Sequence, residues 1–228
     1  MTTIDPTDSL PAEDRPYHET VEKGHHWRTG DDEFDGGKFG MWLFLATEVL
    51  LFAGLFCGYA IMRMKYPEAF ANGSHYLDWR WGGLNTLVLL YSSYTIAAAI
   101  RHTQLGNKAA ARINLIITWF CALAFLVVKL FLEYIPKWGE GKRPGVLFDY
   151  AYAQDPMEPM WWSLYYVATG IHASHVIIGM GLIGWLIVRN EMNRYGPKNY
   201  LAVENVGLYW HIVDLIWIFL FPLLYLIH

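Results

Sequence analysis

Long apolar runs separated by short polar stretches dominate the pattern along this chain. Five of these runs are long enough to cross a bilayer, whose hydrocarbon core requires about 20 apolar residues per helix. They occupy residues 39–62, 82–100, 113–135, 160–188 and 206–227. None alternates polar and apolar residues with the two-residue period of a barrel strand. The pattern therefore predicts an all-α polytopic membrane protein, a bundle of five transmembrane helices.

The segment before the first run differs from the rest of the chain. It is rich in acidic residues, including the sequence DDEFD, and contains no apolar stretch typical of a cleavable signal peptide. We therefore expect an acidic, solvated tail at residues 1–37 and a transmembrane domain at residues 38–228. The net charge of −4, with no basic patch, gives no indication of nucleic-acid binding.

The lysines and arginines predict the orientation in the membrane. Ten of them lie on the same side as the tail, six lie on the other side, and Lys129 falls within a span. Because positive residues are enriched on the cytoplasmic side, the N-terminus is expected in the cytoplasm and the C-terminus outside. Cys57 and Cys121 fall inside spans and are predicted to be small core residues rather than disulfide partners or metal ligands.

Ionisable side chains inside the spans are the candidate functional residues, because charges at membrane depth are costly and normally have partners. From the helical rise, Glu48 and Asp214 each lie about 12–15 Å from the cytoplasmic side. His175 and His211 come close to that depth, so we expect an inner cluster of these four residues. Glu48 fits proton exchange, or coupling to a partner subunit, as well as it fits a buried hydrogen-bond anchor. Asp214 with His211 is more typical of a tether between helices.

A second, outer cluster is predicted near the opposite surface. Lys129 and Glu133 are spaced i to i+4 on one helix face, and Asn85 lies at the start of the second span. A structural ion pair is the favoured interpretation. The chain shows neither an activated nucleophile nor a glycine-rich phosphate loop, so no catalytic centre is predicted.

Two other classes of membrane protein remain open from the residues alone. His172 and His175 share a helix face in GIHASH and His211 lies on another span, so a cytochrome with histidine-ligated haem is one alternative. A secondary transporter is less well supported, because there is no internal repeat and no interrupted pair of helices. The sequence GLFCG in the first span has the small-xxx-small spacing that allows close helix contact.

Each of the five spans contains one distinctive stretch, and in chain order these are ATEVLLFAGLF, GGLNTLVLLYSS, VVKLFLEY, YYVATGIHASHVIIG and YWHIVDLIWIFLF. Together they resemble subunit III of the haem-copper terminal oxidases. The resemblance covers about residues 38–228 and matches the shorter bacterial forms, which have five spans instead of seven. By this resemblance, Glu48 takes the place of the buried glutamate of that family. The stretches add further motif residues at Thr86, Tyr134, Gly170, His172, Trp210 and Trp217.

The resemblance implies an accessory subunit of a proton-pumping cytochrome c oxidase in a bacterial inner membrane. Such a chain holds no haem, copper or other metal. It packs against catalytic subunit I, which carries haem and copper, in a complex with subunit II; small subunits or a respiratory supercomplex are open as further partners. It holds structural phospholipids, supports proton uptake, and protects subunit I from inactivation while oxygen is reduced to water. Subunit III of a quinol oxidase, or of a nitric oxide reductase-associated homologue, remains an alternative.

Overall fold

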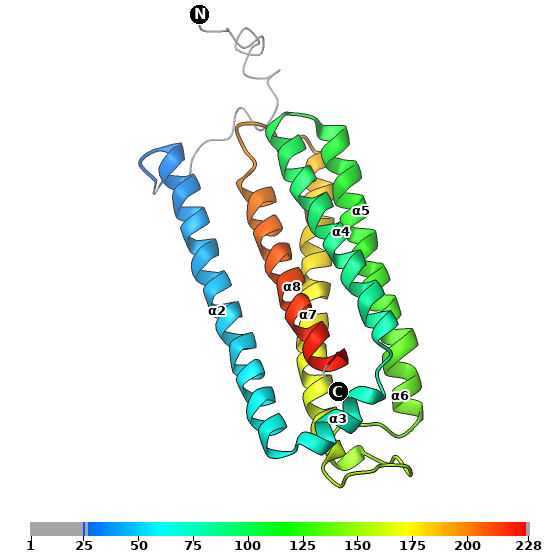
Figure 1. Cartoon of the computed structure of the whole chain (residues 1–228). Coiled ribbons are helices and arrows are strands. Elements are labelled where there is room, and N and C mark those ends of the chain that lie inside the picture. The colour runs from blue at the N-terminus through cyan, green and yellow to red at the C-terminus, as the bar shows by residue number, and fades with distance from the viewer. Residues whose placement is uncertain (1–24, 26, 227–228) are drawn as a thin grey trace, which may run out of the picture.

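Five long helices stand side by side in the computed structural model, which describes residue 25 and residues 27–226 (Figure 1). All five are long and apolar enough to cross a membrane, and the described residues contain no named strand. The predicted all-α, five-span architecture is therefore confirmed. The helices are α2 (Gly30–Lys65), α4 (Trp79–Gln104), a third helix composed of α5 (Lys108–Val127), η2 (Val128–Tyr134) and α6 (Ile135–Gly139), α7 (Glu158–Glu191), and α8 (Leu201–Tyr225).

The first helix starts earlier than the apolar pattern predicts. The backbone N–H of Asp32 donates to the Thr29 hydroxyl, and the Asp32 carboxylate accepts from the Thr29 N–H. This capping box and the acidic first turn, which interacts favourably with the helix dipole, start α2 at Gly30. DDEFD is thus helical, whereas residues 1–24 of the acidic tail lie outside the described residues. We call the end of the bundle where α2 begins the tail end, and the opposite end the far end.

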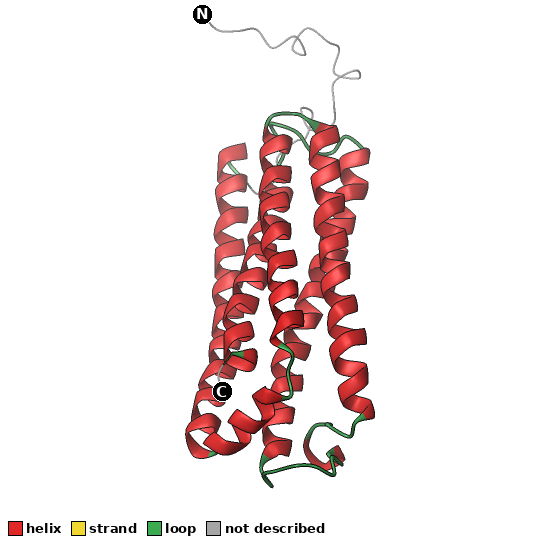
Figure 2. Cartoon of the chain, turned by 45° about the vertical axis from the view of Figure 1, so that its right-hand side comes forward, coloured by secondary structure: helices red, strands yellow, loops and turns green. Residues whose placement is uncertain are grey.

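Helices α4, α5, α7 and α8 pack together as a four-helix unit, and α2 lies along one side of it (Figures 1 and 2). The buried side chains of α2 are Leu45, Phe52 and Tyr59, spaced seven residues apart. α2 therefore contacts the unit through one narrow stripe. A Cβ at Gly54 or Gly58 would meet nothing within 4 Å, so no described helix uses the predicted small-residue face.

The third helix contains a wide turn that the sequence analysis did not predict. Residues Val128–Tyr134 are π-helical, and Pro136 follows directly in α6. Proline has no N–H to donate to the carbonyl of residue 132, and its ring would collide with that carbonyl in a regular α-helix. The wide turn relieves this conflict, and it carries both Lys129 and Glu133.

The far end is covered by a short helix and a loop. α3 (Pro67–His75) was not predicted, because it is too short to produce an apolar run. A Cβ at Gly73 would lie 2.3 Å from the buried indole of Trp161, so α3 packs directly on the start of α7. The ammonium of Lys142 lies 4.2 Å from the centre of the Tyr76 ring, which joins the loop to this cover.

Candidate functional site

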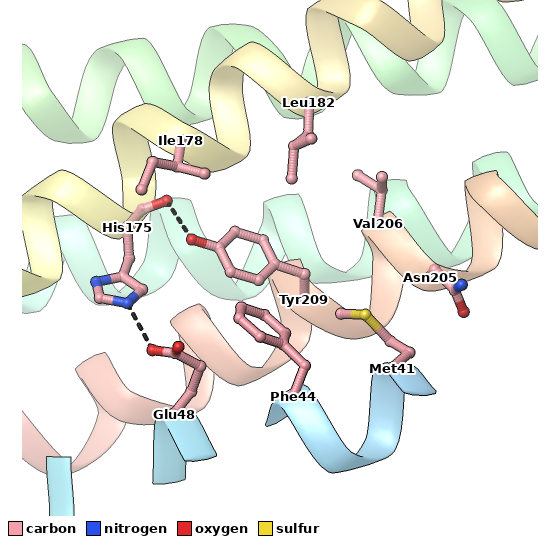
Figure 3. A pocket seen from close by; sticks show the side chains of 9 residues that line it. All are labelled: Met41, Phe44, Glu48, His175, Ile178, Leu182, Asn205, Val206 and Tyr209. Carbon is pink, nitrogen blue, oxygen red and sulfur yellow. Dashed lines mark hydrogen bonds and ion pairs between the residues drawn. The ribbon is translucent and has the colours of Figure 1, made fainter. Parts of the chain in front are cut away.

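A carboxyl–imidazole pair joins α2 to the four-helix unit inside the membrane-spanning region. Glu48 Oε2 lies 2.8 Å from His175 Nε2 (Figure 3). The other ring nitrogen, Nδ1, lies 2.8 Å from the carbonyl oxygen of Ile171. Because a carbonyl only accepts, Nδ1 carries a hydrogen, and Nε2 shares a single proton with the Glu48 carboxyl. The two side chains are 15% and 14% exposed, so the pair is largely buried.

Aromatic side chains hold the His175 imidazole in place. The Tyr209 hydroxyl donates to the His175 carbonyl over 3.1 Å, and the Tyr209 ring stacks on the imidazole with centroids 6.4 Å apart. Phe52, from the buried stripe of α2, meets the same imidazole edge-on at 5.3 Å. The orientation of the histidine is therefore fixed by both helices that flank it.

A cavity of about 420 Å³ opens beside the pair, between α2, α7 and α8. Its polar groups are few, and most of its wall is apolar. All three helices are long enough to span a membrane, so the cavity lies among membrane-spanning segments. Figure 3 shows the lining side chains, which are Met41, Phe44, Glu48, His175, Ile178, Leu182, Asn205, Val206 and Tyr209.

The structure separates the other two members of the predicted inner cluster from this pair. His211 Nδ1 lies 2.7 Å from the Ser93 hydroxyl of α4. Asp214 is only 3% exposed, and the Ser93 side chain also lies beside its carboxyl. The single inner cluster that was predicted is therefore divided into two groups, which lie on different faces of α8. Ser93 was missed, although a polar side chain within an apolar run was a signal for it.

In the outer group, Lys129 and Glu133 meet as an ion pair. Each residue is 2% exposed, and Lys129 Nζ lies 2.6 Å from Glu133 Oε2. The ammonium also donates to the hydroxyls of Tyr165 and Tyr225, and both hydroxyls donate to the same carboxylate oxygen. Sequence reasoning missed both tyrosines. Asn85, the third expected member, is fully buried but has no hydrogen bond to the pair.

The remaining motif residues mostly tie helices together. His172 is fully buried between the rings of Phe125 and Trp217, at centroid distances of 5.5 and 5.2 Å. Gly170 has open space where a Cβ would stand. Three side-chain hydrogen bonds cross between helices, from Trp210 to Ser92 at 2.9 Å, from Trp217 to Thr86 at 3.1 Å, and between Tyr134 and Thr169 at 2.6 Å. 

Within the described part of the chain, no three histidine, cysteine or acidic side chains gather as metal ligands would. The fold and site therefore define a polytopic helical bundle with a carboxyl–imidazole pair beside a cavity between three spans. The family model for cytochrome c oxidase subunit III matches residues 17–228, and the chain belongs to this family of haem-copper oxidase subunits. The resemblance recognised in the five span motifs is confirmed.

Proteins similar to this chain include subunits of both cytochrome c oxidases and quinol oxidases. Cytochrome c oxidase subunit 3 of Synechocystis is 31% identical over 209 residues, covering 90% of this chain and 79% of the relative. Probable quinol oxidase subunit 3 of Staphylococcus haemolyticus is 27% identical over 194 residues, covering 83% and 88%. The heme-copper oxidase subunit I+III of Aeropyrum pernix is 31% identical over 208 residues. This match covers 89% of the chain but only 24% of that fused protein.

Proposed function

We propose that this chain is the accessory subunit III of a proton-pumping respiratory cytochrome c oxidase in a bacterial inner membrane. Family membership and the Synechocystis relative support this assignment. In such a complex, the catalytic subunit carries haem and copper and reduces oxygen to water, and this chain contributes no redox centre. The fused I+III relative supports direct contact with subunit I, because its name joins the two subunits in one chain. Subunit II completes the proposed core.

The Glu48–His175 pair carries the proton part of this proposal. A carboxyl and an imidazole that share one proton across 2.8 Å can take up or release a proton with little movement. The Ile171 carbonyl holds the imidazole through its other nitrogen, so that Nε2 faces Glu48. We assign this pair to proton exchange that supplies the catalytic subunit and slows its inactivation during turnover.

The proposed orientation places the pair on the side from which protons are taken up. The excess of lysine and arginine on the tail side assigns the tail end to the cytoplasm and the C-terminus to the periplasm. Glu48 lies in the tail-end half of the apolar part of α2. In this orientation it is nearer to the cytoplasm than to the periplasm.

The exposed side of α2 suits contact with lipids and with subunit I. Gly54 and Gly58 leave a flat face, where another helix can approach closely. A second cavity, of about 460 Å³, is bounded almost entirely by apolar side chains and suits a phospholipid acyl chain. It is lined by Trp42, Leu45, Ala46, Val49, Leu50 and Ile212.

Purification of the tagged chain in a mild detergent tests the assembly. We expect a large haem-copper subunit and subunit II to co-purify, and all haem absorbance to remain with them after this chain is stripped away. Haem absorbance that stays with the isolated chain would instead support the membrane cytochrome. Solute flux in vesicles that contain this chain alone would support the transporter.

Substitution of Glu48 by glutamine tests the proton role in the assembled complex. We expect normal assembly, slower turnover and faster inactivation, because glutamine keeps the hydrogen bond to His175 but cannot exchange a proton. Glu68→Gln, at an exposed position on α3, is the matched control and should behave as the parent. Turnover and inactivation rates equal to those of the parent would refute the role assigned to the pair.

Quinol oxidase is the second candidate function, favoured by the probable quinol oxidase subunit 3 of Staphylococcus haemolyticus, of which the match covers 88%. The two functions differ in the electron donor, which the other subunits would bind. Oxygen consumption by the purified complex with reduced cytochrome c, and separately with a quinol, distinguishes them. Oxidation of quinol alone would replace the first proposal with the second.

A further inference from the structure

The interior of the four-helix unit contains polar side chains that no described protein group satisfies. Asn85 and His172 are fully buried, and neither side-chain polar atom of either residue has a hydrogen-bond partner among the described residues. The Oε1 atom of Glu133 is also buried without a partner there. These three residues, which we call the interior seam, come from α4, η2 and α7.

Trp217 contacts His172 directly and contacts the neighbours of the other two seam residues, Thr86 beside Asn85 and Lys129 beside Glu133. The indole of Trp217 donates to Thr86, which directly follows Asn85. On another side, the Trp217 ring lies 5.2 Å from the His172 ring, measured between centroids. Lys129, the ion-pair partner of Glu133, has its ammonium 5.0 Å from the same indole.

The register of the helices supports the same grouping. Thr95 of α4 and Thr118 of α5 are hydrogen-bonded at 2.8 Å. Moving ten residues along each antiparallel helix from this bond brings Asn85 opposite Val128, next to Lys129. Asn85 and the Lys129–Glu133 pair therefore lie at a similar level of the interior.

The chemistry of the seam selects a small, neutral ligand that both donates and accepts. The amide of Asn85 and the imidazole of His172 each offer a donor and an acceptor, whereas the free oxygen of Glu133 accepts. Since Lys129 already balances the charge of Glu133, no ion is required. Water meets these conditions, and a buried water normally has two to four polar partners. In a membrane span no bulk water competes for these groups, which makes unsatisfied polar atoms especially costly.

We propose that ordered water molecules bind in the interior seam, where they bridge Asn85 and His172 to Glu133. This hydrated interior is distinct from the cavity beside Glu48 and does not depend on the proposed function. It makes part of the interaction between α4, the third helix and α7 water-mediated.

A density map of the parent protein, purified with its native partners, tests the proposal directly. We expect water peaks at about 2.7–3.2 Å from the Asn85 amide and from a ring nitrogen of His172. A map that resolves buried waters elsewhere in the spans but none along the seam would overturn the proposal. This measurement needs no variant and therefore decides the question even where substitutions prevent assembly.

Apolar substitutions provide the second test. If the seam were dry, Asn85→Leu and His172→Leu would relieve unsatisfied groups, and the melting midpoint would rise or stay constant. If water is bound, each substitution removes a hydrogen-bond partner of that water, and we expect the melting midpoint to fall by about 2–4 °C or more. The double variant should lose less than the sum, because both side chains hold the same water network. Leu89→Met, at a buried position one turn from Asn85, is the matched control and should change the midpoint little.

Discussion

Replacing Lys129 by methionine removes one charge from an almost completely buried ion pair. The ammonium of Lys129 lies 2.6 Å from Glu133 Oε2, and the two side chains are 3% and 2% exposed. Methionine retains much of the apolar stem, so the change mainly removes the charge and its hydrogen bonds. Loss of one partner of a buried pair costs about 3–5 kcal/mol, because the other charge is left uncompensated.

The surroundings of the pair predict different costs for its two halves. Without Lys129, the Glu133 carboxylate still accepts from Tyr165 and Tyr225, and Lys137 Nζ lies 4.0 Å away. We therefore expect Lys129→Met to cost about 3 kcal/mol, at the lower end of the range. Glu133→Gln leaves two ammonium groups facing no carboxylate, so its cost should approach about 5 kcal/mol. The double variant should cost much less than the sum of the two single changes.

Unfolding of the chain in mild detergent, followed by near-ultraviolet circular dichroism, measures these costs. We expect the parent to be the most stable, Lys129→Met to be less stable, and Glu133→Gln to be the least stable. Arg112→Met is the control, because Arg112 and Glu191 form an ion pair whose side chains are both 46% exposed, and it should cost less than about 1 kcal/mol. A Lys129→Met variant within about 0.5 kcal/mol of the parent would show that the buried pair does not hold this end of the bundle.

Four further predictions concern packing and titration. Tyr59→Phe removes the hydroxyl that donates to the Leu223 carbonyl, and should weaken attachment of α2 by about 0.5–1.5 kcal/mol, measured as faster proteolysis of α2. Gly179→Ala places a Cβ 2.6 Å from a neighbouring indole and should cost about 1–3 kcal/mol in the same unfolding assay. Gly170→Ala, where the space is open, should be neutral or stabilising. Burial raises the pKa of Tyr195, in the loop after α7, to about 12. Because this tyrosine ionises at a lower pH in the unfolded chain than in the folded protein, the parent should lose stability relative to Tyr195→Phe as the pH rises from about 10 to about 12 in an alkaline unfolding titration.

The five spans were predictable because each is an apolar run long enough to satisfy its own backbone hydrogen bonds within a bilayer. The helix ends were less predictable, since the start of α2 depends on a local cap in which Thr29 and Asp32 satisfy each other. The wide turn near Pro136 was missed because apolar periodicity over such a short stretch does not distinguish α-helical from π-helical turns. Local hydrogen bonds, rather than hydropathy, determine these features.

The depth of the candidate site residues in the membrane could be predicted from the sequence, but the directions in which their side chains point could not. Matching depths indicated that Glu48 and His175 could meet, and the structure brings them together. The same reasoning also added His211, which instead faces Ser93. Tyr209 and His211 are two residues apart, or about 200° around an α-helix, so only one of them can face His175. Which one does so depends on how α8 packs. The functional roles of the cluster residues remain predictions.

The wide turn in the third helix has a consequence for how relatives should be aligned. A π-helical turn accommodates an additional residue while the flanking helices keep their faces, so it corresponds to a one-residue insertion in an α-helix. A relative without a proline equivalent to Pro136 is expected to be one residue shorter within positions 128–134. If such a relative were aligned without a gap, every residue on one side of the turn would be assigned to a helix face about 100° away from its true one. Deleting one residue there together with Pro136→Ala should therefore be tolerated better than the deletion alone.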